Sequence, residues 1–242
     1  MQKSQNHTPT FPRPLTTVDV VIFTVLDDQL QILLVQRPSG HREPFPGQWA
    51  LPGGFVNVEQ DASLEACAQR KLKEKTGVEA SYLEQLGSWG NATRDPRGWS
   101  VTHVYFALLP HACITLEKGA NAADVAWFPI QGETVEVALA FDHGLILQAA
   151  IRRLRGKAEY TSLPVYLLHE AFTLPELQQA YELVLGRPVD KSGFRTRVMA
   201  ADLVIPVDQQ RAGGYRPAQL YRLRVPGDLL VFPRTFSPKR GE

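Results

Sequence analysis

The chain has 242 residues, which is long enough for two domains of the usual 100 to 200 residues or so each. With 44% hydrophobic and 21% charged residues it has the composition of an ordinary soluble protein, and no apolar run approaches the roughly 18 residues of a membrane span. The formal net charge of +1 is divided unevenly, because residues 1–160 carry 15 basic and 17 acidic side chains and residues 161–242 carry 11 and 8. The basic excess in the second part points toward a nucleic-acid partner but is too small to establish one.

Residues 1–15 form a polar segment with prolines and without the apolar core of a signal peptide, and we expect a disordered arm there. The two cysteines, Cys67 and Cys113, lack the spacing of a metal site and agree with a reducing compartment. The sequence therefore predicts a cytoplasmic protein with no membrane partner.

The first regular element is a β-hairpin. Residues 18–25 (VDVVIFTV) are rich in β-branched side chains, and Asp27 and Asp28 form a turn into a second strand at 31–36. A loop broken by three prolines follows. It leads to a glycine turn at 52–54.

A charged helix then occupies the end of residues 53–78, GGFVNVEQDASLEACAQRKLKEKTGV. Ser63 is expected to cap its start, and Gly77 to end it. Residues three and four apart are neighbours on a helix surface. The side chains at 71, 74 and 75 therefore share one face.

This stretch resembles the Nudix box, Gly-x5-Glu-x7-Arg-Glu-U-x-Glu-Glu-x-Gly-U with U aliphatic, but only in part. Aligned from its end, the residues that fit are Arg70, Leu72, Glu74, Gly77 and Val78. Lys71 and Lys75 stand where the motif has carboxylates. The front half is two residues too long, so that its Glu position falls on Gln60 or on Ala62, depending on the end from which it is counted.

In Nudix enzymes this helix face holds divalent cations. Mg²⁺ prefers oxygen ligands, and two ammonium groups beside Glu74 repel it. Glu59 and Asp61 lie close by and could substitute for the missing carboxylate. We interpret the site as catalytically degenerate, without metal or catalytic residues, its vestigial box being Arg70, Lys71, Glu74 and Lys75. The alternative is an active Nudix hydrolase, an ADP-ribose pyrophosphatase that would need Mg²⁺.

Further strands are predicted at 83–88, 100–109 and 125–129, and a second helix at 142–156. Strands around one central helix, with a second helix added, resemble the Nudix fold. We therefore expect an α/β Nudix-like sandwich over residues 16–158 that binds an effector.

The loop at 91–99, NATRDPRGW, carries the second chemical signal. Two arginines can bind a diphosphate in bidentate fashion, and an indole can stack on a base. The competing interpretation is a surface turn in which Arg94 and Asp95 merely pair. Beside the box, an Arg-Asp-Pro-Arg-Gly loop resembles that of Nudix proteins that handle ADP-ribose, which makes Arg94, Asp95, Arg97 and Trp99 effector candidates.

Three further residues are weaker candidates for effector binding. Arg37 and Arg42 lie near the mouth implied by the hairpin and the proline loop, and His143 begins the second helix. His143 is otherwise a satisfied partner in the first turn, and Asp142 is most simply its N-cap. Because this helix has one apolar stripe, we expect it to couple the two domains.

From residue 163 the pattern changes to helices joined by short turns. Thr173 and Glu176 form a capping box at the start of a helix that ends at Gly186. Asp190 then caps a second helix with a basic start. This order indicates a helix-turn-helix, whose second helix enters the major groove. Its DNA-binding candidates are Lys191, Ser192, Arg195, Thr196 and Arg197.

Two strands at 203–207 and 219–223 enclose a basic loop with Arg211, Arg216 and a glycine pair at its tip. A basic hairpin after a helix-turn-helix makes a winged helix. We expect it over residues 159–242, against the competing view of a small helical domain with solvated charges.

Both halves together resemble one family, the Nudix-related transcriptional regulators of NAD metabolism (NrtR). The resemblance spans about residues 16–225, and its marks are TVDVVIFT, RKLKEKTGV, RDPRGWSV, AFDH, FTLPELQ, KSGFRTRV and RPAQLY. It implies a repressor of NAD biosynthesis or salvage genes, with operator DNA as partner, ADP-ribose as effector and no cofactor. A single winged helix reads a short site, so we expect a homodimer on a near-palindromic operator.

Overall fold

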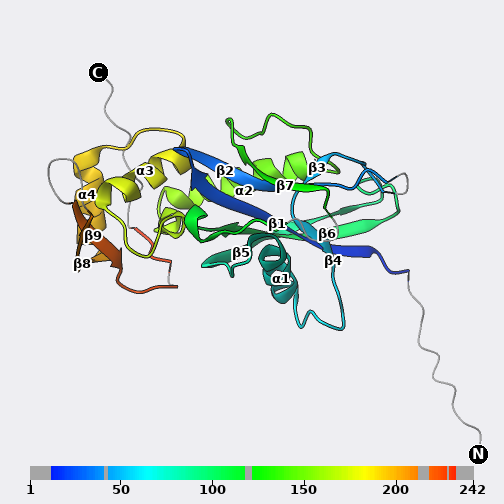
Figure 1. Cartoon of the computed structure of the whole chain (residues 1–242), viewed down its shortest axis with the longest axis horizontal. Helices are drawn as coiled ribbons and strands as arrows, with labels where there is room; N and C mark the ends of the chain where they lie inside the picture. The colour runs from blue at the N-terminus through cyan, green and yellow to red at the C-terminus, as the bar shows by residue number, and fades with distance from the viewer. Residues whose placement is uncertain (1–11, 41–42, 118–121, 212–217, 228, 233–242) are drawn as a thin grey trace, which may run out of the picture.

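The computed structural model describes residues 12–40, 43–117, 122–211, 218–227 and 229–232. Within them, a mixed β-sheet with two helices is followed by a smaller helical part with a two-stranded sheet (Figure 1). The strands are β1 Leu15–Leu26, β2 Gln29–Gln36, β3 Trp49–Ala50, β4 Gly53–Phe55, β5 Tyr82–Asn91, β6 Ser100–Leu108, β7 Asp124–Pro129, β8 Val204–Arg211 and β9 Ala218–Leu223. The helices are α1 Leu64–Thr76, α2 His143–Ala158, α3 Leu174–Leu185 and α4 Lys191–Ala200, with short 3-10 turns η1 His111–Cys113 and η2 Leu163–Leu167.

The long strand β1 organises the larger sheet. It pairs antiparallel with β2, antiparallel with β4 and parallel with β6, while β3 and β7 pair with β2 and β5 pairs with β6. Asp27 and Asp28 have φ angles of 50° and 56°. Left-handed backbone at both turn residues matches the twist of a two-residue hairpin, which confirms the predicted turn.

The two faces of this sheet are covered by different helices, because successive side chains of a strand point to opposite faces. Val18, Val20 and Ile22 of β1 pack with Leu72 of α1 on one face. Val21 and Phe23, which point the other way, pack with α2 on the other face. The larger part is therefore the expected α/β sandwich.

Local signals set the ends of the helices as predicted. The Ser63 hydroxyl accepts a hydrogen bond from the Ala66 N–H, and Gly77 ends α1 in the left-handed region at φ 71°. In α3 both halves of the capping box between Thr173 and Glu176 are present. The Asp190 carboxylate accepts from the Gly193 N–H at 2.6 Å and starts α4.

The second part is the predicted helix-turn-helix with a wing. α3 ends at Gly186 (φ 68°), and a short turn leads into α4. The strands β8 and β9, which follow α4 in the chain, pair antiparallel. The strands are longer than the sequence indicated, since β8 continues to Arg211. The glycine tip and Arg216 lie outside the described residues.

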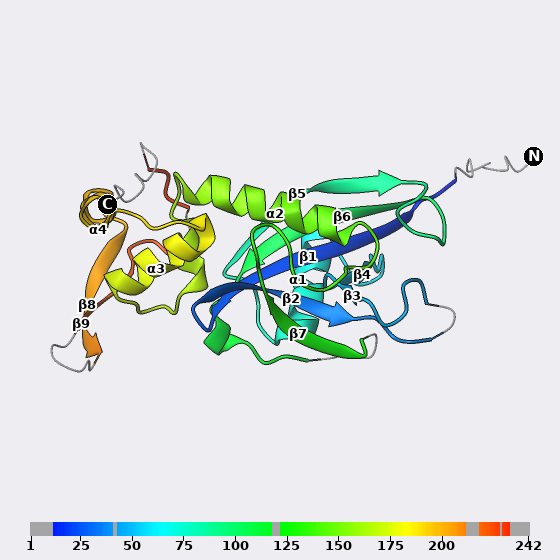
Figure 2. The same cartoon turned by 90° about the horizontal axis from the view of Figure 1, so that it is seen from above.

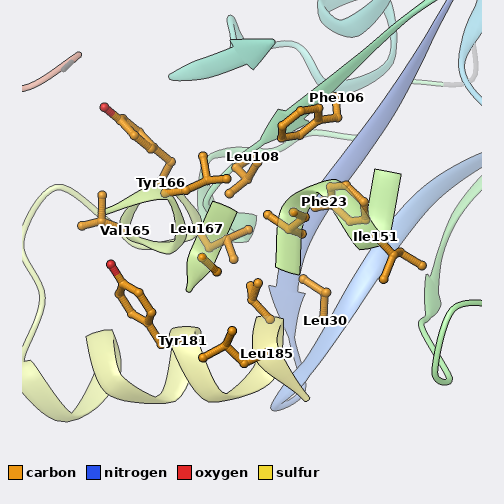
Figure 3. Close-up of a cluster of buried hydrophobic side chains, with 14 of the residues drawn as sticks. Phe23, Leu30, Phe106, Leu108, Ile151, Val165, Tyr166, Leu167, Tyr181 and Leu185 are labelled. Atoms are coloured by element: carbon orange, nitrogen blue, oxygen red, sulfur yellow. The ribbon is translucent and has the colours of Figure 1, made fainter. Parts of the chain in front are cut away.

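One hydrophobic core runs through both parts. Figure 3 shows Phe23 and Phe106 of the sheet in the same cluster as Ile151 of α2 and Tyr181 and Leu185 of α3. Figure 2 shows why: α2 lies along the sheet and reaches the side where α3 packs. The winged helix is thus attached through buried side chains.

Residues 229–232 return to the joint between the two parts, the segment around Tyr160 and Ser162 that follows α2. The Leu230 carbonyl accepts from the Ser162 N–H at 2.9 Å, and the Phe232 N–H donates to the Tyr160 carbonyl at 2.7 Å. The Phe232 side chain is buried in the shared core. Among the described residues, no helix has the length and apolarity to cross a bilayer.

Candidate functional site

A cleft of about 1040 Å³ opens between the glycine turn, α1, the loop after β5 and the start of α2. It gathers residues that are far apart in the sequence. Those predicted from the sequence that line it are Arg37, Glu59, Arg70, Lys71, Glu74, Lys75, Arg94, Asp95, Arg97 and His143. The cleft is large enough for a dinucleotide-sized ligand.

The glycine turn forms the floor of the cleft because side chains do not fit there. A Cβ on Gly53 would lie 1.9 Å from Oδ1 of Asp19, the residue that it faces across the β1–β4 pair. Gly54 has a φ of 148°, which favours glycine, and a Cβ on it would lie 3.3 Å from Nζ of Lys71. The turn therefore brings backbone close to the charged face of α1.

Arg70 occupies the carboxylates that could have held a metal. Its guanidinium donates to Asp61 at 2.6 and 2.7 Å and to Glu74 at 2.8 Å. The hydrogen bonds from Arg70 hold the pKa of Asp61 well below its usual range. Asp61, the proposed substitute ligand, is thus already neutralised by a positive charge.

The remaining charges of this face are cationic. Lys71 lies 3.5 Å from Glu74, with 14% of its side chain exposed, and Lys75 is buried, which lowers its pKa. Within the described ranges, no three His, Cys, Asp or Glu side chains come together as a metal site would require. The donor set therefore does not fit a divalent cation, and it presents ammonium groups where a Nudix enzyme has metal.

The arginine loop is tied to its surroundings in a way that the sequence did not predict. Arg94 pairs with Asp142, through Nε to Oδ2 at 3.0 Å and Nη2 to Oδ1 at 2.8 Å, and not with Asp95. Asp95 instead accepts from Arg97 at 2.7 Å. Asp142 is the N-cap residue of α2 but makes no side-chain capping bond, so its expected role is replaced by the pair with Arg94.

Aromatic rings line the cleft at positions other than the one predicted. Trp99 is 52% exposed and lies against Gly90 of β5, outside the residues that line the cleft. Phe55 and Phe141 line it instead, with the guanidinium of Arg97 5.1 Å from the ring centre of Phe55 and that of Arg37 4.9 Å from the ring centre of Phe141. The geometry thus favours these two phenylalanines as stacking surfaces.

His143 is a buried member of a hydrogen-bonded network at the back of the cleft. Its Nδ1 accepts from the Leu51 N–H at 2.9 Å, which leaves the ring proton on Nε2, 3.7 Å from Asp19. Asp19 also accepts from the Thr102 hydroxyl at 2.7 Å. Burial lowers the pKa of His143. His143 therefore lines the cleft while its ring is held by partners outside the first turn of α2.

Arg37 is held at the mouth by Glu43 and the Pro44 carbonyl, at 2.9 and 2.6 Å. Burial lowers its pKa, against the opposing effect of Glu43. Arg42 lies outside the described residues. The Arg37 guanidinium thus lines the cleft together with that of Arg97.

The start of α4 presents its polar side chains to solvent. Lys191, Ser192, Arg195 and Thr196 are exposed, whereas Phe194 and Val198 are buried. Arg197 is half-buried, and its charge lies close enough to Tyr181 to oppose the effect of burial, which raises the pKa of that phenol. The exposed face is the one that a helix-turn-helix presents to the major groove.

Comparison with known proteins agrees with both halves of this structure. Residues 15–150 match the NUDIX domain, and residues 164–223 match the NrtR DNA-binding winged helix domain. The ADPR responsive transcriptional repressor NtrR of Acinetobacter baylyi is 46% identical over 95% of this chain and 90% of its own length. The chain belongs to the NrtR family of Nudix-related transcriptional regulators.

Two solved structures show what other NrtR proteins bind. Shewanella oneidensis NrtR in complex with a 27mer DNA is 45% identical, with a TM-score of 0.83 over 92% of this chain and 100% of that one. The Nudix domain of the same protein in complex with ADP ribose is 47% identical, with a TM-score of 0.55 over 62% of this chain and 94% of that one. These complexes contain the two ligand classes expected from the sequence of the present NrtR homologue.

Several residues of the cleft escaped the sequence analysis. Asp19 lies inside an apolar strand, and Phe55 and Phe141 lie within the stretches GGFVNVEQ and AFDH but not at their charged positions. Phe141 has a left-handed φ of 56°, which is unusual for an aromatic residue and turns the chain into α2. A buried carboxylate in a β-branched strand was the one signal that could have pointed to Asp19.

Proposed function

We propose that this protein is a transcriptional repressor that binds operator DNA of NAD biosynthesis or salvage genes through its winged helix and loses affinity for that DNA when ADP-ribose occupies the cleft. The observation that carries the proposal is the cationic face of α1. It keeps the place of a Nudix box while Arg70 neutralises its carboxylates and Lys71 and Lys75 add positive charge.

This face suits a receptor for a diphosphate. The diphosphate of ADP-ribose carries two negative charges that a hydrolase would neutralise with metal ions. Lys71 and Lys75 supply positive charge without polarising a water for attack, so the ligand would be bound and left intact. The rings of Phe55 and Phe141, each beside an arginine, offer flat surfaces for its adenine.

On the DNA side, Arg195 is the proposed base-reading residue, with Lys191 and Ser192 placed for phosphate at the helix start. We expect Thr196 and the strand residue Arg211 to contribute further contacts, and Arg216 to act from the wing. A two-fold homodimer would place two such helices in successive major grooves, about 10 base pairs apart.

Fluorescence anisotropy with labelled promoter fragments tests this function directly. We expect tight binding to fragments upstream of NAD biosynthesis or salvage genes, and release on addition of ADP-ribose but not of ribose 5-phosphate. Equal binding at saturating ADP-ribose would contradict the effector role.

The same samples distinguish the repressor from a hydrolase. Incubation with ADP-ribose and Mg²⁺ or Mn²⁺, followed by chromatography, is expected to return ADP-ribose unchanged. Release of AMP at about 1 per second or faster, within the ordinary range of enzymes, would make the protein an active pyrophosphatase.

A further inference from the structure

One ion pair joins the effector cleft to the helix that supports the winged helix. Arg94 lines the cleft, yet its Nε and Nη2 both donate to Asp142, its Nη1 donates to the Ser100 hydroxyl at 3.4 Å, and its side chain is only 4% exposed. Asp142 immediately precedes α2 and gives its carboxylate to Arg94 instead of to the N–H groups of the helix. The first turn of α2 therefore receives no side-chain cap from Asp142.

The other end of α2 is fastened to the winged helix. Ile151 and Leu154 are fully buried in the core shared with α3. Arg155 donates to the Val184 carbonyl of α3 at 3.2 Å, and Glu159, just beyond α2, pairs with Arg187 after α3 at 2.8 Å. One helix, α2, thus contacts the cleft at its start and α3, the helix that precedes α4, near its end.

We propose that the Arg94–Asp142 pair is the contact through which the effector acts on DNA affinity, with Asp142 as a positioning residue that competes with the ligand for Arg94. An anionic diphosphate in the cleft draws the guanidinium away, and the released carboxylate turns to cap α2. The start of the helix then repacks. This inference rests on the proposed function, since it assumes that an anionic effector weakens DNA binding.

If the Asp142 carboxylate competes with the ligand for Arg94, its removal should strengthen ADP-ribose binding. If it only supports the structure, its removal should weaken binding. Replacing Asp142 by Asn removes the competitor, so ADP-ribose should bind about tenfold tighter, the typical strength of one charge-assisted hydrogen bond. The same variant resembles the liganded state. Its operator affinity without ADP-ribose should fall toward that of the liganded wild type, and added ADP-ribose should change it little, because coupling between two sites is reciprocal.

The experiment measures ADP-ribose affinity by titration calorimetry and operator affinity by anisotropy, with and without ADP-ribose, for the wild type and for Asp142→Asn. Asp142→Ser repeats the test, because both Asn and Ser are favoured at helix starts and should preserve folding. Asp142→Glu keeps the charge and should retain most of the response. The matched control is Glu133→Gln, which removes an exposed carboxylate–arginine pair from the same helix and should behave as wild type.

The outcomes separate the two proposals. A wild type that does not respond to ADP-ribose contradicts the proposed function itself. A wild type that responds, together with Asp142→Asn and Asp142→Ser variants that respond equally or bind ADP-ribose more weakly, overturns the role of the pair while the function stands.

Discussion

At the scale of single residues, the sign of the charges on the cleft-facing side of α1 determines whether the site suits a metal ion. Arg70 spans Asp61 and Glu74, and Lys71 and Lys75 complete a positive face where the Nudix motif has carboxylates. A divalent metal ion and an ammonium group can both neutralise the charge of a diphosphate. Only the metal ion also binds and polarises a water molecule that could attack it. This exchange of charge is the basis of the proposed binding without hydrolysis.

On the proposed function, the lysines would make effector binding independent of metal. We expect the affinity of the wild type for ADP-ribose, measured by calorimetry, to be the same in Mg²⁺ and in EDTA. The double substitution Lys71→Glu and Lys75→Glu should weaken binding in EDTA by roughly tenfold or more, and Mg²⁺ should recover part of the loss. Lys73→Glu is the control, because Lys73 is exposed and pairs with Glu79 away from the cleft. A wild type that loses its ligand in EDTA would contradict the prediction.

His143 predicts a dependence of stability on pH. Burial lowers its pKa in the folded state, so the unfolded chain takes up a proton first as the pH falls. The contribution of His143 to stability is present above the unfolded pKa of about 6.5 and decreases below it, by at most about 1.4 kcal/mol per pH unit.

Urea unfolding at pH 7.5 and pH 5.5 checks this sign. The free energy of unfolding should decrease between these values by more in the wild type than in His143→Gln, whose amide can still accept from the Leu51 N–H. The other histidines contribute equally to both proteins. An identical decrease in both would show that His143 does not titrate in this range.

At the scale of elements, α4 separates its arginines by geometry. Arg195 is exposed beside Lys191, one helical turn away, whereas Arg197 is half-buried near Tyr181. The Asp190 carboxylate caps α4, and that of Asp202 accepts from Arg224.

Substitutions on α4 should therefore differ in kind. Arg195→Ala should cost roughly 1 to 3 kcal/mol on the operator and relax the preference at one base pair, whereas Lys191→Ala should weaken all DNA about equally and lower the salt slope by about one per half-site. Anisotropy over a salt series with single-base operator variants measures both effects. If Arg197→Ala abolishes the sequence preference and Arg195→Ala does not, the opposite face of α4 reads the DNA.

Elements were predictable where their signals are local. Ser63 and Gly77 mark the two ends of α1, Thr173 and Glu176 mark the start of α3, and Asp27 begins the turn of the first hairpin. In each case the hydrogen-bonded or paired residues are at most four positions apart in the sequence. The contacts that build the cleft are of another kind.

Those contacts join distant parts of the chain. Arg94 reaches Asp142 across 48 positions, and Leu51 reaches His143 across 92. No spacing rule predicts such pairs, because packing of α2 on the sheet creates them. The residue types of the cleft were therefore largely foreseen, while their partners and its aromatic rings were not.

At the scale of the whole molecule, the shared core predicts that the two parts unfold together. All four tryptophans lie within residues 49–127, so their fluorescence reports the larger part alone. Leu177→Ala removes a fully buried side chain from α3, which should cost about 2 to 5 kcal/mol.

In a cooperative molecule this loss shifts the tryptophan fluorescence midpoint in urea together with the circular dichroism midpoint. The exposed Glu170→Ala should shift neither. A fluorescence midpoint that stays at its wild-type value while the dichroism midpoint falls would show that the parts unfold separately.

The return of residues 229–232 to the joint has a consequence for how the protein is made. The backbone of Tyr160 and Ser162 finds its partners in Phe232 and Leu230, and these emerge from the ribosome about 70 residues later. Until then a nascent chain holds a complete effector cleft and a recognition helix, but its joint lacks Phe232 and the backbone bonds that fasten it. On the proposed function, communication between effector and DNA would thus be among the last properties that synthesis confers.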